Sequence, residues 1–373
     1  MAKSEDFDFM AALTYAKSRG RSFFEQLVDI FRVVRSGLKM SPEEYYYYGL
    51  FEPEMPDEER QRFISDDFWI IAAMKTCDRE WWAINHDKLL SQMVLQCNGA
   101  PVPTIRAVAH PYRKFPGAPT LTTIEHTATW LRQASYPMFS KPVTGVQSKG
   151  QSLLESFDVE TDTLTRRKDE AISVNDFARQ VWEYRGGTSS NDGHVFQEVL
   201  EAHPEILRLC GPGIGAVRVI VVLDEQKGPK ILWTTWKVMV GGNIADNFWR
   251  GNMCAHVDPE TGEVLRVIRG AGLDLEVVTK HPDTREMLLG AMLPDWQRMR
   301  EVVLDCASLM PKVRFQGWDI GLCKQGPVIV ESNTGSGFAL PQLSSGKGFM
   351  SDEFRQFLVD AEKSLKEGAE FEL

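Results

Sequence analysis

Cysteine is scarce in this sequence and never closely spaced. The six cysteines among 373 residues lie singly, with no CxxC motif. A disulfide framework and a cysteine-ligated zinc site are therefore not indicated, and we expect reduced thiols. Long apolar runs are also missing, because no stretch approaches the roughly 18 residues of a membrane span. The N-terminus lacks a basic region followed by an apolar core. We expect a cytoplasmic protein without a membrane span.

Positive charge is outweighed by negative charge. The 42 lysines and arginines face 52 aspartates and glutamates, which gives a formal net charge of -10. Proteins that live on nucleic acid or anionic membranes need clustered Lys and Arg, so neither is an expected partner, although local basic sites stay open. The seven histidines are dispersed, and the sequence shows no Ser-His-Asp set, no histidine metal cluster and no dinucleotide fingerprint. These absences exclude several common enzyme classes.

The length favours two or three structural units. Residues 1–82 are predicted to be helical, with apolar residues from Phe23 to Val34 at three- and four-residue steps along one stripe. We interpret this region as a scaffold, and its aromatic clusters Tyr45–Tyr48 and Trp81-Trp82 as packing between helices. The rest of the chain alternates predicted strands and helices with short turns, which predicts a mixed α+β architecture.

Two helices are predicted, at 122–134 and at 176–185, the second ended by Gly186-Gly187. Two hairpins are predicted as well. The first runs over 216–238, and the second runs over 314–333 and turns at Lys324 to Pro327.

The second hairpin carries the polar residues of interest. Side chains alternate along a strand, so Glu331 and Asn333 share one face, while Val328 and Val330 point into the opposite layer. Asp319 lies near the paired position of the preceding strand, so its carboxylate can converge with them. An oxygen-only set of this kind suits Mg²⁺. A solvated strand face remains an alternative for these three residues viewed alone.

A lysine ends the short apolar strand at 136–142 and precedes a glycine loop. Lys141 is followed by Gly145, Lys149 and Gly150. Glycines let backbone N–H groups approach phosphate oxygens, and a lysine supplies the compensating charge. The Walker ending is missing, so the loop is not of that type. A surface hairpin turn is an equally open interpretation.

The segment from His194 to Glu201 is predicted to be a strand that runs into acidic and apolar residues. A purine needs an apolar wall with backbone groups along its edge, and a nearby carboxylate can accept from ribose hydroxyls. A strand that simply ends in exposed glutamates is the alternative.

Taken in order, these segments resemble the ATP-grasp series. The order is Asp87-Lys88, Lys141 with its loop, Gln197-Glu198 and Asp319 followed by Glu331-Ser332-Asn333. Segments such as Val217-Arg218-Val219 and Gly317-Trp318-Asp319 resemble the sugar-transfer-associated ATP-grasp family most closely. The resemblance implies an ATP-grasp fold in which two α+β subdomains grip ATP. It divides the chain into a helical region 1–82, a subdomain 83–195 with a lid loop at 143–150, and a subdomain 196–373 with the magnesium site.

The same resemblance implies ATP and Mg²⁺ as cofactors and suggests a role for each motif. Many relatives place an arginine two residues before the metal-binding aspartate, where this chain has Gly317, and Arg218 is the candidate replacement. Arg218 and Lys237 are predicted to neutralise charge on the transferring group, and ordinary surface ion pairs are the alternative for both. The implied nucleotide contacts are Lys88 and Lys141 at phosphates and adenine edge, Gly145, Lys149 and Gly150 in the lid, Gln197, Glu198, Val199 and Leu200 at the base, and Glu201 or Glu205 at the ribose. The implied metal ligands are Asp319, Glu331 and Asn333.

The function implied by the family is that of an ADP-forming ligase. Such an enzyme activates a carboxylate as an acyl phosphate for attack by an amine or similar nucleophile. A small-molecule or sugar kinase and a noncatalytic nucleotide-binding protein in polysaccharide assembly are the alternatives. The expected partners are a small-molecule carboxylate and a nucleophile, with no nucleic acid, and the relatives make a homodimer an option.

Overall fold

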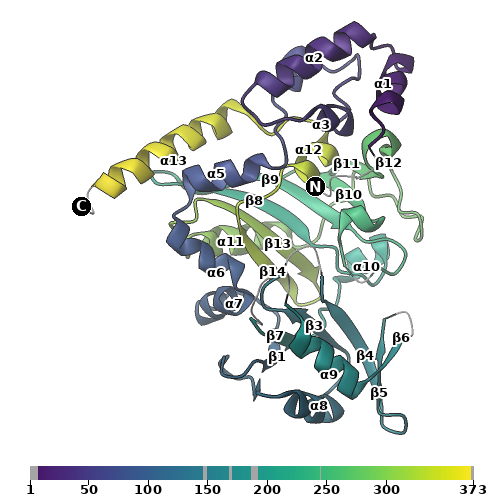
Figure 1. Ribbon diagram of the computed structural model, residues 1–373, viewed down its shortest axis with the longest axis vertical. Helices are drawn as coiled ribbons and strands as arrows, with labels where there is room; N and C mark the ends of the chain where they lie inside the picture. The colour runs from purple at the N-terminus through teal and green to yellow at the C-terminus, as the bar shows by residue number, and fades with distance from the viewer. Residues whose placement is uncertain (1–6, 146–148, 168–169, 186–191, 244, 371–373) are drawn as a thin grey trace.

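A computed structural model shows three layers along the long axis of the molecule (Figure 1). It describes residues 7–145, 149–167, 170–185, 192–243 and 245–370. N-terminal helices lie at one end, a large sheet lies in the middle, and a smaller unit built on a second sheet lies at the other end. Part of the predicted lid, 146–148, and the predicted helix end at Gly186-Gly187 lie outside the described residues.

The N-terminal region is helical, as expected, and its helices continue beyond residue 82. Helix α2 begins with a capping box in which Ser22 and Glu25 satisfy each other's backbone N–H groups. Helix α7 begins at Lys88 because the Asp87 side chain accepts from the N–H groups of the first turn. The helices are α1 (Phe9–Ser18), α2 (Phe23–Arg35), α3 (Pro42–Tyr47), α4 (Asp57–Arg60), α5 (Phe68–Thr76), α6 (Trp82–His86) and α7 (Lys88–Cys97).

The first sheet has the order β2-β1-β7-β3-β4-β5-β6 and is antiparallel except between β1 and β2. Helices α8 and α9 pack together against it, and α8 confirms the helix predicted at 122–134. The predicted boundary at residue 195 falls inside β7. The elements are β1 (Ile105–Ala109), β2 (Thr120–Leu121), α8 (Ile124–Gln133), β3 (Met138–Pro142), β4 (Ser152–Asp158), β5 (Thr163–Arg166), β6 (Glu170–Ser173), α9 (Val174–Glu183) and β7 (His194–Gln197).

The second sheet has the order β12-β11-β10-β9-β8-β13-β14. Both predicted hairpins are confirmed, as β8 with β9 and as β13 with β14. The elements are α10 (Pro204–Cys210), β8 (Val217–Asp224), β9 (Gly228–Val238), β10 (Met253–Val257), β11 (Val264–Arg269), β12 (Glu276–Val278), α11 (Trp296–Ala307), β13 (Phe315–Cys323), β14 (Gly326–Thr334), α12 (Ala339–Ser345) and α13 (Asp352–Glu370).

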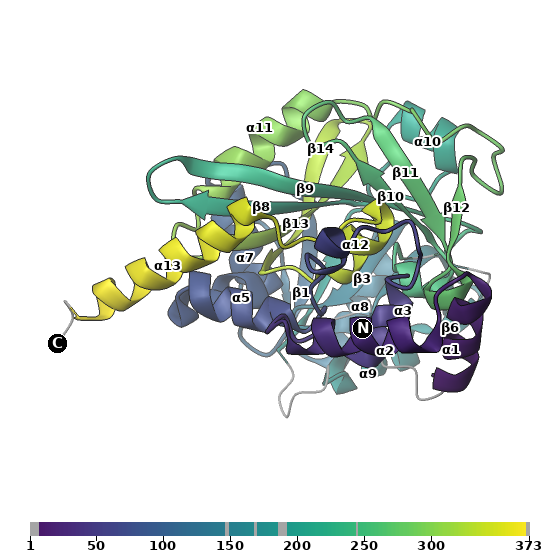
Figure 2. The same cartoon turned by 90° about the horizontal axis from the view of Figure 1, so that it is seen from above.

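Helices cover both faces of the second sheet. Figure 2 shows α11 on one side and α5, α12 and α13 on the other. Strand β13 is buried along its whole length, because it lies between two neighbouring strands and under both helical layers. The largest apolar core surrounds this sheet. Burial on both faces makes β13 a rigid support for the polar groups it carries.

Two further features of the fold concern the cysteines and the hydropathy of the helices. All six cysteines are free, and only Cys97 is exposed. Along the described part of the chain, no helix combines the length and apolar composition needed to cross a membrane.

Candidate active site

Asp319 and Glu331 face each other across the hairpin of β13 and β14. In the register of the pair Asp319 lies opposite Glu331, and Gly317 lies opposite Asn333. The prediction that the three polar residues share one side of the hairpin is therefore met by the pairing. A bulge follows Asp319, because Ile320 pairs with Ile329 and leaves Val330 as an extra residue.

The bulge changes the position of one side chain. Strict alternation predicts Val330 in the opposite layer, but Val330 lines the same cavity as Glu331. The extra residue interrupts the alternation, so two neighbouring residues of β14 reach one side. Val330 thus adds apolar surface beside the carboxylates.

Asp319 is held by two cations from neighbouring strands. Arg218 of β8 lies directly opposite it in the ladder. The guanidinium donates from Nε to Oδ1 at 2.7 Å and from Nη2 to Oδ2 at 2.9 Å. The Lys237 ammonium lies 3.1 Å from Oδ1 of Asp319 and 3.3 Å from Oδ2 of Asp246. Arg218 and Lys237 are thus brought together with the predicted metal ligands.

These contacts decide the charge states. Burial by itself raises the pKa of Asp319, but the charges of Arg218 and Lys237 outweigh it and hold that pKa well below the usual range. Burial lowers the pKa of Lys237, and the carboxylates of Asp246 and Asp319 more than restore it. All three groups are therefore charged at neutral pH. Sequence analysis did not single out Asp246 as a partner, because only the fold brings it to Lys237.

Two lysines approach Glu331 from elsewhere in the fold. The Lys88 ammonium, at the start of α7, lies 3.9 Å from Oε1 of Glu331 and donates to the Gly145 carbonyl at 3.1 Å. Lys141, at the end of β3, is only 5% exposed. Burial lowers the pKa of Lys141 to about 8, with Glu331 opposing the shift and Lys88 adding to it. The Lys141 ammonium makes no hydrogen bond or ion pair to the described residues, so its charge lacks a close partner.

These groups converge on a cavity of about 640 Å³ between the two sheets. Its charged lining residues number seven Lys or Arg and four Asp or Glu among the described residues, a surplus of three positive charges in a chain of net charge -10. The sequence-predicted residues that line it are Lys88, Lys141, Gly145, Lys149, Gln197, Glu198, Val199, Leu200, Arg218, Lys237, Asp319, Glu331 and Asn333.

Three predicted residues do not line the cavity. Gly150 packs toward Tyr184, where an added Cβ would come within 2.5 Å of the ring. Glu201 binds Lys324 at 3.1 Å, and Glu205 binds Arg208. The reason for the two glutamates is the path of the chain after β7, which pairs with the far end of β13 through Ala202 and Cys323 and so leads away from Asp319. Neither glutamate lines the cavity, and their contact with a ribose stays a prediction.

The end of β7 offers polar groups to the cavity. Gln197 is buried, and its Oε1 has no hydrogen-bond partner among the residues that the structure describes. Glu198 accepts from the Thr104 N–H at 2.7 Å, which fixes its carboxylate. A buried amide without a partner is costly unless a ligand supplies one. The arrangement can hold the polar edge of a flat ring.

The donor set fits Mg²⁺ better than a transition metal. Asp319, Glu331 and Asn333 offer carboxylate and amide oxygens on one wall of an open cavity. Magnesium is held by one or two carboxylates together with water and nucleotide phosphates. Within the described ranges no three His, Cys, Asp or Glu residues gather as a ready metal cluster. The residues present therefore fit a magnesium ion that takes its other ligands from water and a phosphate.

Residues 73–356 match the model of the sugar-transfer associated ATP-grasp family. The chain belongs to this family. Its two sheets around a shared cavity are the ATP-grasp fold, as the resemblance in the sequence predicted.

Solved structures show distant similarity. Biotin carboxylase from Campylobacter jejuni is 14% identical at a TM-score of 0.45, over 80% of this chain and 51% of that one. VanG D-Ala:D-Ser ligase from Enterococcus faecalis is 13% identical at a TM-score of 0.42, over 77% and 64%. D-alanine–D-alanine ligase from Bacillus anthracis is 12% identical at 0.42, over 79% and 72%. The chain thus spans about half to three quarters of these ATP-grasp relatives. A search of curated protein sequences finds no match.

Proposed function

We propose that this ATP-grasp protein is a magnesium-dependent ligase that uses ATP to activate a carboxylate as an acyl phosphate, releasing ADP, for attack by an amine or a similar nucleophile. One observation carries the proposal. The cavity between the sheets gathers a surplus of three positive charges around two carboxylates that face each other on β13 and β14. A polyanion bound together with a divalent cation fits this arrangement, because the cationic side chains would bind the polyanion and the carboxylates would bind the cation.

The cationic side chains have separate tasks in this proposal. Lys88 and Lys141 approach Glu331 from α7 and β3, and their charges would bind phosphate oxygens. Arg218 and Lys237 keep Asp319 ionised and oriented, and they can also face charge on a transferring group. Asp319, Glu331 and Asn333 would hold the magnesium. When bound, magnesium neutralises charge on the nucleotide phosphates.

Phosphorylation of the acceptor carboxylate turns a poor electrophile into one with a good leaving group. The chain's contribution to such a step is orientation and charge neutralisation. Near the carboxylates the cavity continues past Asn243, Phe248 and Trp249, which leaves room for an acceptor beside the nucleotide. Rings and amides of this kind can bind flat or hydroxylated groups.

The test is ATP turnover with magnesium over pools of amino acids, hydroxy acids and sugar acids, with and without added amines, with ADP and phosphate resolved from AMP and pyrophosphate. ADP formation that needs both a carboxylate and an amine is expected. Glu331→Gln should remove it, and Glu155→Gln, on an exposed strand face, should keep it. A stable phosphorylated product would instead identify the protein as a kinase. Turnover indifferent to Glu331 would refute the site.

A further inference from the structure

Helix α2 carries an apolar face that is turned away from the protein. Phe24 is 75% exposed, Phe31 58% and Leu27 57%, and Phe23 and Val34 are exposed as well. At 100° per residue these five side chains fall within about a quarter to a third of the helix circumference. We refer to these residues, Phe23, Phe24, Leu27, Phe31 and Val34, as the α2 apolar face. It is the sequence stripe of the N-terminal region, with Ile30 at its buried edge.

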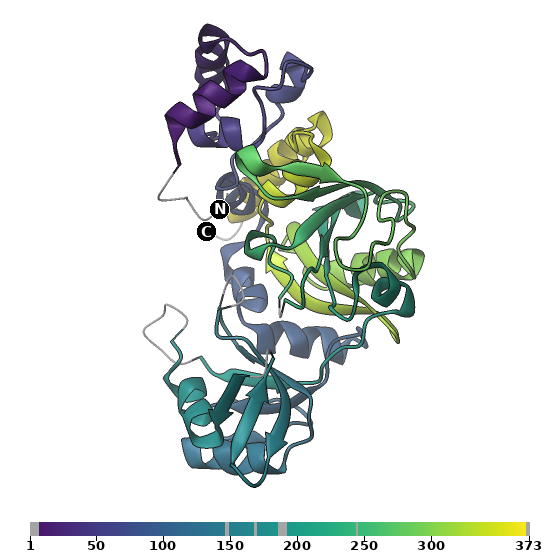
Figure 3. The ribbon, with the colours of Figure 1, turned by 90° about the vertical axis from the view of Figure 1, so that its right-hand side faces the viewer.

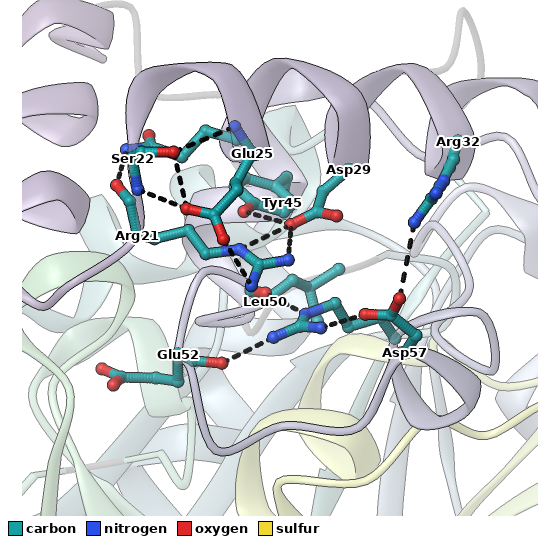
Figure 4. Close-up of polar contacts among 11 residues, drawn as sticks. Arg21, Ser22, Glu25, Asp29, Arg32, Tyr45, Leu50, Glu52 and Asp57 are labelled. Carbon is teal, nitrogen blue, oxygen red and sulfur yellow. Dashed lines mark hydrogen bonds and ion pairs between the residues drawn. The ribbon is translucent and has the colours of Figure 1, made fainter.

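The buried side of α2 fixes this orientation. Asp29 is only 4% exposed, and it accepts from Arg21 at 2.7 Å and from the Tyr45 hydroxyl at 3.2 Å (Figure 4). Gln26 is fully buried and accepts from the Tyr46 hydroxyl at 2.9 Å. Turning the helix to bury its phenylalanines would leave these buried polar groups without their partners, which is unfavourable. The apolar face is therefore held outward by the fold.

Basic residues border the apolar face. The Lys17 ammonium lies 4.6 Å from the Phe23 ring centre, and the Arg35 guanidinium lies 4.5 Å from that of Phe31. Residues 9–39 contain six Lys or Arg and two Asp or Glu. Arg19 and Arg32 pair with Glu52 and Asp57 outside this segment, so the net charge around the helices is +2 in a chain of net charge -10. The overall negative charge of the protein, which should repel anionic surfaces, is thus reversed around α1 and α2.

The α1–α2 pair forms one end of the molecule. Figures 1 and 3 both place these helices at the end of the long axis opposite the first sheet. Helix α1 adds further exposed apolar side chains, with Met10 at 66% and Tyr15 at 39%. A surface at this end can touch a flat partner without hindrance from the rest of the protein.

We propose that α1 and α2 dock this protein on the surface of an anionic lipid bilayer, with the α2 apolar face among the acyl chains and the bordering cations at the headgroups. A helix with phenylalanines and leucines on one face and Lys and Arg beside it is suited to lie in the plane of the interface. The cations would meet anionic lipid, as Lys and Arg do near membrane surfaces. A second copy of the same face would bring net positive charge against net positive charge, so self-association is disfavoured.

The test is flotation of the full-length protein with vesicles of phosphatidylcholine alone and of phosphatidylcholine mixed equally with phosphatidylglycerol. We expect binding to the anionic vesicles that weakens as salt is raised. The triple variant Phe24→Ser, Leu27→Ser, Phe31→Ser should bind on the order of a hundredfold more weakly. Val159→Ser, at a residue 79% exposed in another part of the fold, should bind like the parent.

A charge variant tests the second half of the proposal. Lys17→Gln with Arg35→Gln should reduce binding to anionic vesicles about tenfold, while Lys280→Gln, an exposed lysine elsewhere, should not. Absence of vesicle binding, or binding that the triple variant retains, would overturn the proposal. So would a dimer, seen by sedimentation, that the triple variant dissociates, because that result assigns the face to a second copy. Unchanged thermal unfolding of each variant shows that the fold is intact.

Discussion

Lys141 should destabilise the protein in the absence of ATP, and replacing it with methionine measures the size of this effect. Its pKa falls from the usual 10.5 to about 8 because burial removes water and no described partner replaces it. A shift of this size corresponds to about 3 kcal/mol between the charged and neutral forms. The penalty is fully present below the folded pKa and disappears as pH rises toward the unfolded value. Lys141→Met should therefore raise the free energy of unfolding by about 3 kcal/mol at pH 7 and by little near pH 10.5.

Urea unfolding at several pH values measures this difference, and ATP titration calorimetry measures the functional side. Lys280→Met, at an exposed lysine, serves as the matched control and should change stability by less than about 0.5 kcal/mol. The Lys141 variant should lose ATP affinity, and the parent's affinity should fall above pH 8, because the neutral amine no longer attracts phosphate. A variant less stable than the parent, or a gain that does not depend on pH, would refute the reasoning.

Further predictions follow from other contacts of the site and the N-terminal region. Asp319→Asn should lower the free energy of unfolding by about 3 to 5 kcal/mol, because it leaves the buried Arg218 without its carboxylate and Lys237 with Asp246 alone. Glu331→Gln should change stability by less than about 1 kcal/mol yet remove ATP turnover, and unfolding curves beside a turnover assay distinguish the two. Gly215→Ala should lower the free energy of unfolding by about 2 kcal/mol and the melting temperature by several degrees, because the added Cβ would lie 1.9 Å from the Lys237 carbonyl oxygen. Asp29→Asn should speed hydrogen exchange of the N-terminal helices, at a cost of about 2 kcal/mol, and leave ATP binding intact. A stable Asp319→Asn protein would contradict the ion-pair analysis.

Local patterns were sufficient for the hairpins and for several site residues. The polar residues Glu331 and Asn333 are two apart on one strand, and the short turn brings Asp319 to within one residue of the position opposite Glu331. The bulge at Val330 then makes Asp319 pair with Glu331. The helix at 122–134 could be predicted because Thr123 caps a periodic segment. Geometry of this kind depends on residues that are close in the sequence. The family resemblance added how the segments follow one another along the chain.

Long-range pairing decided the rest of the site. Arg218 meets Asp319 only because β8 and β13 are neighbours in the sheet. The bulge at Val330 interrupts the strict alternation, and the pairing of Ala202 with Cys323 takes Glu201 out of the cavity. None of these contacts is local in the sequence, because each depends on which strands the fold places side by side.

The sequence by itself determined the two hairpins, the helix at 122–134 and the existence of an apolar stripe on α2, whereas the bulge that pairs Asp319 with Glu331 appears only in the structure. Tertiary structure alone decided which way that stripe faces, because the polar contacts of Asp29 come from another helix through Tyr45. It also decided that Lys141 is buried without a close partner among the described residues. Periodicity fixes which residues share a face, whereas burial and charge depend on what the folded chain packs against that face.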